Sequence, residues 1–264
     1  MRLGVLTSPR LVNLIGRIER FYYERSAQIS VLSDGFKENL IQKGVSQKKI
    51  TVIPACVDVE FIHPLPRENN LRKKWGLLGK FVVLYAGNIG FSQGLEIMLK
   101  AAKLLIAYTR IVFVLVGEGA AKSNLESMAE DMNLSNVYFF PFQPREDVPL
   151  VYALADACLV SLKRSIVVES VPSKTYSIMS SGRPIIATVN RDTETGHLLE
   201  HARCGLCIEP ENADELAQAI MQLHEDDPLR VEMGECGRNF VVGKYSRQIA
   251  AEHYHGLIKK LVSN

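Results

Sequence analysis

Runs of four to six apolar residues recur through the middle of the chain, and between them apolar residues are spaced three or four positions apart. Continuous apolar runs are typical of strands buried on both faces of a parallel sheet, whereas the spaced pattern is typical of amphipathic helices. The pattern predicts six strands, at residues 81–86, 111–116, 137–140, 157–161, 184–188 and 205–208. Strands and helices in alternation predict an α/β fold, a Rossmann-like, doubly wound parallel sheet covered by helices.

Helices are expected where the apolar residues are spaced to lie on one face. They are predicted at residues 93–108, 122–132, 145–155, 173–181, 195–202, 212–225, 228–241 and 246–262. The last helix has an apolar face, interpreted as a packing face, formed by Ile249, Tyr254, Leu257, Ile258 and Leu261.

The first fifty residues have a different pattern. They predict a helix, a strand, a helix and a second strand, at residues 10–25, 28–32, 33–43 and 50–53. Ser33 and Asp34 can cap the second helix. Residues 58–70 have the prolines and polar residues of a turn and linker. We therefore expect two regions, a small one at 1–50 and a large one at 51–264.

Composition narrows the class of protein. Of the 264 residues, 47% are apolar and 23% are charged, which is typical of a globular chain with a buried core and excludes collagen, coiled coils and long disordered tails. No uninterrupted apolar run exceeds six residues, whereas a membrane-spanning helix needs roughly 20. No signal-peptide core is found near the first residue. We therefore expect a cytoplasmic protein.

Charge distinguishes the same two regions. The net charge of +2 gives no reason to expect nucleic-acid binding, but the first fifty residues carry +5 and the rest −3. The basic, amphipathic helix at 10–25 is a candidate for contact with an anionic membrane surface or with a partner chain. Its apolar face can also belong to a core that is absent, and such a face would favour a homodimer.

The five cysteines are an odd number and lie mostly in apolar runs, which indicates reduced, buried thiols. Cys204 and Cys207 form a C-x-x-C pair without the further ligands that a structural zinc needs, so packing is the preferred interpretation. No D-x-D pair is present to hold a divalent ion, and we predict no metal and no cofactor.

Three loops at the carboxyl ends of predicted strands are candidates for ligand binding, because ligands of open parallel sheets bind at that edge. The first follows the strand at 81–86 and contains Gly87, Asn88, Gly90, Gln93 and Gly94. Glycines let backbone amides approach an anion at a helix start. The loop has neither the G-x-x-x-x-G-K-[ST] nor the G-x-G-x-x-G order, so phosphate binding and a plain tight turn both remain open.

The second loop has Glu118 between two glycines, where the carboxylate can meet a ribose hydroxyl or the turn can be purely structural. The third loop leads from Glu169 into a helix that Ser173 can cap. Lys174 lies in the first turn, where a cation opposes the helix dipole, and a bound diphosphate would explain its presence. A solvated lysine and a surface glutamate are the alternative interpretation.

Several segments follow one another in the order of a known family. They read VLSDGFKENL (31–40), ITVIP (50–54), VD (57–58), YAGNIG (85–90), QGL (93–95), VGEG (116–119), ESVPSKTY (169–176), GRPIIA (182–187) and CGL (204–206). Together they resemble the C-terminal, donor-binding half of retaining GT-B glycosyltransferases that use nucleotide sugars. The GNIG and PSK variants are similar to the branch that builds surface polysaccharides, such as capsule, O-antigen or colanic acid.

The resemblance implies roles for the matching positions. Glu169 would contact hydroxyls of the donor sugar, and Glu169 and Lys174 are the candidate catalytic residues. The Gly90 loop would approach the phosphates of a UDP- or GDP-linked sugar, and Phe142 would line the nucleobase pocket. The sugar and diphosphate would be held by the segment formed by Ser170, Val171, Pro172, Ser173 and Lys174.

The sequence also departs from the family pattern. Ser177 stands where the family has a second glutamate that binds ribose hydroxyls, and Glu118 is a possible substitute. Asn88 and Gln93 stand where the family has an Arg and Lys phosphate clamp, so Lys174 becomes the main candidate cation.

The largest departure is at the N-terminus. The family has a second Rossmann-like domain that binds the acceptor, and residues 1–50 resemble only its last part. The chain is thus expected to be a fragment, a truncated frame or the donor-binding subunit of a split enzyme that is inactive alone and needs a partner half. A UDP-sugar epimerase of the same fold and a non-catalytic nucleotide-binding or interaction module are the alternatives.

Overall fold

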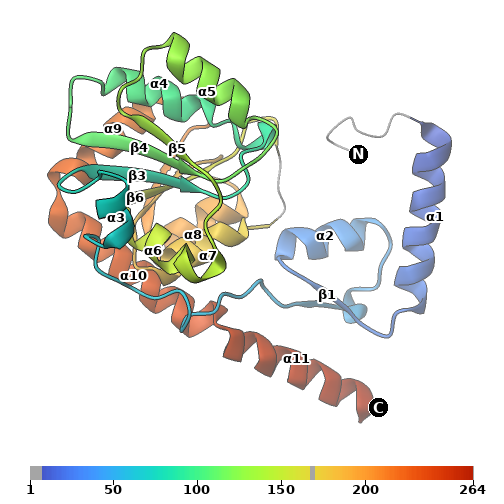
Figure 1. The fold of residues 1–264 in the computed structure, drawn as a ribbon. Helices are drawn as coiled ribbons and strands as arrows, with labels where there is room; N and C mark the ends of the chain where they lie inside the picture. Colours follow the sequence, from blue (N-terminus) through green and yellow to red (C-terminus); the bar gives the residue numbers. More distant parts are fainter. Residues whose placement is uncertain (1–7, 167–169, 264) are drawn as a thin grey trace.

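The computed structural model describes residues 8–166 and 170–263, and its largest unit is a six-stranded parallel sheet (Figure 1). The strands are ordered β5-β4-β3-β6-β7-β8, and every neighbouring pair is parallel. Their bounds are β3 Phe81–Ala86, β4 Ile111–Val116, β5 Val137–Phe140, β6 Ala157–Ser161, β7 Ile185–Thr188 and β8 Gly205–Ile208. The predicted Rossmann-like α/β fold is confirmed, and the chain reverses its direction of growth between β3 and β6.

Helices cover both faces of this sheet (Figure 1). Helices α4, α5 and α9 pack on the face that carries Val83 and Tyr85, and α6, α7, α8 and α10 pack on the face that carries Val82 and Leu84. The bounds are α3 Asn70–Lys74, α4 Glu96–Leu104, α5 Lys122–Asp131, α6 Val148–Ala153, α7 Ser173–Ser180, α8 Glu194–Ala202, α9 Ala213–Glu225 and α10 Asp227–Tyr245. Alternate residues of one strand thus enter two separate cores, which explains the continuous apolar runs.

The sequence pattern was least accurate at helix ends. The helix predicted at 93–108 is the shorter α4, preceded by a separate 3-10 turn at Phe91–Gln93. The helix predicted at 145–155 is a 3-10 turn at Arg145–Asp147 followed by α6. Helix α3 was not predicted, because its basic face lacks the apolar period, and the side chain of Asn69 caps it by accepting from two backbone amides.

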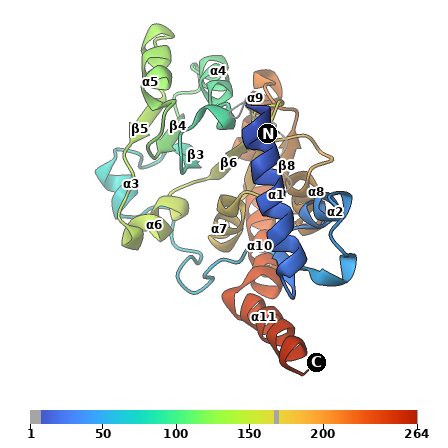
Figure 2. The same ribbon diagram turned by 90° about the vertical axis from the view of Figure 1, so that its right-hand side faces the viewer.

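The N-terminal segment forms a small unit beside the large sheet (Figures 1 and 2). It consists of α1 Pro9–Arg25, β1 Ile29–Val31, α2 Asp34–Gln42, a 3-10 turn at Gln47–Lys49 and β2 Ile50–Val52. Strands β1 and β2 pair in parallel, and Ser33 caps α2 as predicted. The small sheet extends past residue 50, and the division of the chain at that residue stays a prediction.

The core of the small unit is minimal. Leu40, Val45 and Ile50 form its cluster of buried side chains. Apolar side chains along α1 remain between 40% and 65% exposed, namely Leu11, Leu14, Ile15, Ile18, Phe21 and Tyr22. The apolar face predicted for this helix therefore lies open in the described structure.

The linker that follows the small unit is hydrogen-bonded to the junction between α10 and the last helix. Val57 donates its amide to the carbonyl of Tyr245 and pairs with Ser246, at the start of α11 Arg247–Val262. Helix α11 leaves the body of the protein, and no described residue in it is buried (Figure 1). The packing face predicted for this helix is only partly covered by the described residues: Ile249 and Leu257 are half-buried, whereas Ile258 is 58% exposed. No helix in the described ranges has the length and apolarity needed to cross a bilayer.

Candidate functional site

The candidate loops meet at the carboxyl edge of the sheet, where the strand order reverses. The loop after β3 and the loop after β6 flank this reversal, which is the position where open α/β sheets bind ligands. The two loops touch, because Lys163 donates its amide to the carbonyl of Ser92 and Ser161 donates its hydroxyl to the carbonyl of Gln93, over 2.6 Å.

Two glycine loops are locked together by their backbones. The amides of Gly87 and Ile89 donate to the carbonyls of Val116 and Glu118. A Cβ on Gly117, whose φ is +153°, would lie 1.9 Å from the carbonyl oxygen of Gly87. Only glycine permits this approach, so the second turn has a structural role. The role of Glu118 in nucleotide binding stays a prediction.

The polar side chains of the first loop hold the loop itself. The side-chain oxygen of Gln93 accepts the amide of Gly90 over 3.0 Å, and the hydroxyl of Tyr85 donates to the carbonyl of Asn88 over 2.6 Å. Gly94, with φ +60°, packs against Lys163. The side chain of Asn88 is exposed and accessible to a ligand.

Lys174 is the cation at the centre of this edge. Its Nζ lies 3.7 Å from the centroid of the Tyr85 ring and next to Gly87, whose Cβ position would be 2.9 Å away. Within the described residues no carboxylate forms an ion pair with it. Burial lowers the pKa of Lys174 to about 7. A cation held over an aromatic ring without a counter-ion is well placed to meet an anionic ligand.

The start of α7 supplies backbone donors beside this lysine. The predicted cap by Ser173 is wrong, since Pro172 is the N-cap residue, has extended backbone angles and gives no side-chain cap. Ser173 is instead the first helical residue. The first-turn amides of α7 are therefore free of a side-chain acceptor within the described structure, and they are the groups that bind anions at helix starts.

The remaining predicted residues are spread along the same edge. Glu118 is half-exposed and forms an ion pair with Lys122 over 2.7 Å. Phe142 is 56% exposed beyond β5, whereas Phe140 is stacked on Trp75 and is unavailable to a base. Ser170 and Val171 precede α7, and Ser177 hydrogen-bonds Tyr152, whose pKa is raised mainly by burial. Glu169 lies outside the described residues.

A cleft of about 650 Å³ opens between the small unit and this edge. Its walls include Asp34 of α2, Val171, Tyr176 of α7 and His197 of α8. The amide of Gly35 donates to the carboxylate of Glu194 across it, over 3.2 Å. Sequence patterns do not predict the cleft, because its residues come from elements that are distant in the chain. The side chain of His197 is exposed on this wall.

The edge thus offers amide donors, an exposed aromatic ring and Lys174, which has no ion pair in residues 8–166 and 170–263. This arrangement can bind a phosphorylated ligand with a ring system. Among the described residues no group of three or more His, Cys, Asp or Glu side chains could hold a metal ion. Cys204 and Cys207 are free thiols, and burial raises the pKa of Cys204 to about 12.

Comparison with known proteins agrees with this geometry. Residues 67–240 match the family described as glycosyl transferases group 1. The chain is 31% identical over 217 residues to an Escherichia coli protein named as the colanic acid biosynthesis glycosyl transferase WcaI, covering 81% of the chain and 53% of WcaI. It is 24% identical to a glycosyltransferase named WbjE of Pseudomonas aeruginosa, covering 98% of the chain and 65% of WbjE. The chain thus spans about half to two thirds of these relatives.

Solved structures show the same fold. Anabaena Alr3699/HepE, solved in complex with UDP and glucose, has a TM-score of 0.78 at 18% identity. The matched region covers 97% of this chain and 69% of the HepE chain. The C-terminal domain of LpcC from Francisella tularensis has a TM-score of 0.60 at 22% identity. The matched region covers 72% of this chain and 99% of the LpcC domain. With its sheet, its two glycine loops and its sequence relatives, the chain belongs to the glycosyl transferases group 1 family, and its α/β domain has the GT-B fold.

Proposed function

We propose that this chain is the donor-binding half of a retaining glycosyltransferase that moves a hexosyl group from a nucleotide diphosphate sugar during surface polysaccharide synthesis. The observation that carries the proposal is Lys174, which lies between the glycine loop and the start of α7 and has no ion-pair partner among the described residues. UDP is the first nucleotide to test, because HepE was solved with UDP and with UDP-glucose. The polysaccharide role is supported by the likeness to WcaI.

In this proposal the diphosphate lies across the α7 amides, with Lys174 at its charged end. When the bond between the sugar carbon and the phosphate oxygen breaks, both electrons stay on the diphosphate. Lys174 and the amides would stabilise that charge, the acceptor oxygen would bond to the sugar carbon, and the proton of the acceptor hydroxyl would pass to an oxygen of the departing diphosphate. Phe142 would stack on the base, and Glu169 would hold sugar hydroxyls.

Calorimetric titration with UDP, GDP and ADP tests the site. We expect UDP to bind and Lys174→Gln to weaken it by roughly tenfold to a hundredfold, the value of a hydrogen bond to a charged group. Lys103→Gln, on α4 and away from the loops, is the matched control and should leave affinity unchanged. No binding of any nucleotide at millimolar concentration would refute the proposal.

The acceptor half is proposed to come from elsewhere. The chain spans 53% of WcaI and 65% of WbjE, and the open apolar face of α1 gives a surface on which a partner half can pack. The chain alone is expected to bind UDP-glucose without transferring or hydrolysing it, which a radiolabelled donor would reveal. Turnover by the chain alone would contradict the half-enzyme proposal.

The same face of α1 gives the other expected contacts, a homodimer or peripheral association with an anionic membrane. Sedimentation at several concentrations and flotation with anionic liposomes distinguish them. Replacing Leu14 and Ile18, which are 53% and 49% exposed, by serine should abolish either association. A wild-type chain that is monomeric and stays off liposomes would rule out both.

A further inference from the structure

A second cavity lies at the opposite, amino edge of the sheet. Its volume is about 470 Å³, and it opens between the linker, the starts of β6 and β7, and helix α10. Four arginines line it, Arg67, Arg183, Arg230 and Arg238. Their side chains come from three separate segments of the chain, the linker, the loop before β7 and helix α10, so the cluster is a product of the fold. None of them belongs to the loops of the proposed donor site.

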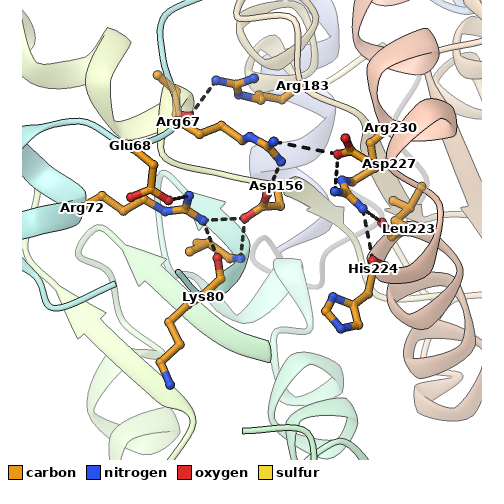
Figure 3. Close-up of polar contacts among 12 residues, drawn as sticks. Arg67, Glu68, Arg72, Lys80, Asp156, Arg183, Leu223, His224, Asp227 and Arg230 are labelled. Atoms are coloured by element: carbon orange, nitrogen blue, oxygen red, sulfur yellow. Dashed lines mark hydrogen bonds and ion pairs between the residues drawn. The ribbon is translucent and has the colours of Figure 1, made fainter. Parts of the chain in front are cut away.

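Two of these arginines are matched by carboxylates (Figure 3). Arg67 lies between Asp156, at 2.6 Å, and Asp227, at 3.8 Å. Arg230 forms an ion pair with Asp227. A fifth arginine, Arg72, is buried behind them and takes the second oxygen of Asp156, at 2.6 Å. These carboxylates are therefore already engaged.

The other two arginines, Arg183 and Arg238, form no ion pair with any described residue. Arg183 donates to the carbonyls of Leu65 and Ala153 over 2.7 and 2.8 Å, and within the described chain no carboxylate lies within ion-pair distance of it. Its Nε is buried without a hydrogen-bond partner among the described residues, as is that of Arg230. Burial, together with the charges of Arg67 and Arg72, lowers the pKa of Arg183.

Arg238 likewise bonds only neutral groups among the described residues. Its Nη1 donates to the carbonyls of Val59, Ile62 and Ser180 and to the Ser180 hydroxyl. A partly buried guanidinium without a carboxylate retains its full positive charge, and guanidinium groups bind phosphate in a two-point geometry. The wall of the cavity therefore carries a surplus of positive charge and free donors.

We propose that this cavity binds a small phosphorylated ligand, whose phosphate lies between Arg183 and Arg238. The volume exceeds that of a phosphate ion and is within the range of pockets that enclose small molecules. A sugar phosphate is the ligand class that matches both the charge and the size. The site is separate from the donor loops, and it does not depend on the function proposed for them.

The experiment measures binding of glucose 1-phosphate, pyrophosphate and inorganic phosphate by calorimetry, in a Lys174→Gln background that weakens the donor site. Glucose 1-phosphate should bind more tightly than inorganic phosphate, because it also fills the cavity. Equal affinities for glucose 1-phosphate and inorganic phosphate would show that the site recognises only the phosphate group, and would overturn the assignment of a sugar phosphate as its ligand. Absence of binding by all three at millimolar concentration would overturn the whole proposal.

Charge variants on the exposed rim test the location without removing any arginine. Glu235 lines the cavity and has no ion pair in the described structure, so Glu235→Gln should tighten binding by roughly threefold to tenfold, the effect of one charge at this range. Val231→Glu, at a lining position that is 51% exposed, should weaken it by a similar factor. A misfolded protein cannot gain affinity, so the first variant guards against that explanation.

Glu232→Gln is the matched control. Glu232 lies on the same helix and pairs with Arg203, and it does not line the cavity. The affinity of the Glu232→Gln variant for glucose 1-phosphate should equal that of the Lys174→Gln protein from which it is made. Identical affinities for all three variants would show that the anion binds elsewhere and would overturn the proposal.

Discussion

The two edges of the six-stranded sheet both carry positive charge, but they hold it in different ways. At the carboxyl edge the charge is one lysine over the Tyr85 ring, surrounded by glycine loops and backbone amides. At the amino edge it is a group of arginines bonded to Asp156, Asp227 and backbone carbonyls (Figure 3).

This difference predicts that the amino edge contributes mainly to stability and the carboxyl edge mainly to ligand binding. Lys174 has no ion pair among the described residues, so an incoming anion would break none of the ion pairs that the structure describes. The arginines at the amino edge join the linker to the domain, because Arg67 bonds Asp156 and Arg183 bonds the carbonyl of Leu65. Substitutions at the amino edge should therefore reduce stability first, and those at the carboxyl edge should reduce binding first.

The largest expected effect is on stability, at Asp156. This carboxylate is 5% exposed, accepts Arg67 and Arg72 over 2.6 Å each, and also accepts the amide of Val82 over 2.8 Å. Asp156→Asn would leave the guanidinium of Arg72, which is 3% exposed, buried without full compensation. We expect the free energy of unfolding to fall by about 3–5 kcal/mol in urea titrations.

The control for Asp156 is an exposed ion pair. Arg203 and Glu232 are 74% and 57% exposed, so Glu232→Gln should change the free energy of unfolding by less than about 1 kcal/mol. A loss below about 1 kcal/mol for Asp156→Asn as well would remove the distinction between the two edges.

The next effect is at the carboxyl edge, where Gly117→Ala should affect stability and binding together. The φ of +153° alone is expected to cost about 1–3 kcal/mol, and the new Cβ would collide with the carbonyl of Gly87. Displacement of the first loop should also weaken UDP binding. Gly243→Ala, on α10 with no atom within 4 Å of the new Cβ, should instead stabilise by about 0.5–1 kcal/mol.

A third effect is the pH dependence of Lys174. Its pKa is about 7 in the folded protein and about 10.4 in an unfolded chain. Between pH 7 and about pH 10, the lysine is therefore largely neutral in the folded state and protonated in the unfolded state. The contribution of Lys174 to stability should therefore rise as the pH rises from 7 to about 10, and Lys174→Met should remove this rise in unfolding titrations.

Deprotonation of Lys174 should have the opposite effect on UDP binding, which should weaken as the pH rises. The charged lysine is the form that binds the diphosphate, so affinity should fall by roughly tenfold or more between pH 7 and pH 9. In Lys174→Arg the charge persists over this range and the decline should disappear. A wild-type affinity that stays constant to pH 9 would contradict a role for Lys174 in binding.

The smallest effect is expected at Glu118. It is half-exposed and pairs with Lys122, so Glu118→Gln should change the free energy of unfolding by no more than about 0.5 kcal/mol. If the carboxylate accepts ribose hydroxyls, the variant should weaken UDP binding but leave binding of a dideoxyribose analogue unchanged. Equal losses for both nucleotides would rule out the ribose contact.

Much of the site could be predicted locally. Gly87, Gly94 and the glycine before Glu118, Gly117, lie in the loops predicted from the sequence, and all three have positive φ angles. The position of Lys174 in the first turn of a helix predicted either a bound anion or a solvated lysine. The cap at Ser173 was wrong, because a proline in extended conformation can occupy the same position. The sequence gives no means of deciding between these two starts.

The sequence by itself determined the strands, the α/β class and the glycine turns, since these depend on which neighbouring residues are buried and on local backbone angles. Only the tertiary structure decided that Lys174 lies over Tyr85 and that Arg67 meets Asp156. The partners in each pair are separated by several strands and helices, and the sheet order β5-β4-β3-β6-β7-β8 brings them together. Contacts of this kind leave no periodic signal, because they depend on which strands become neighbours.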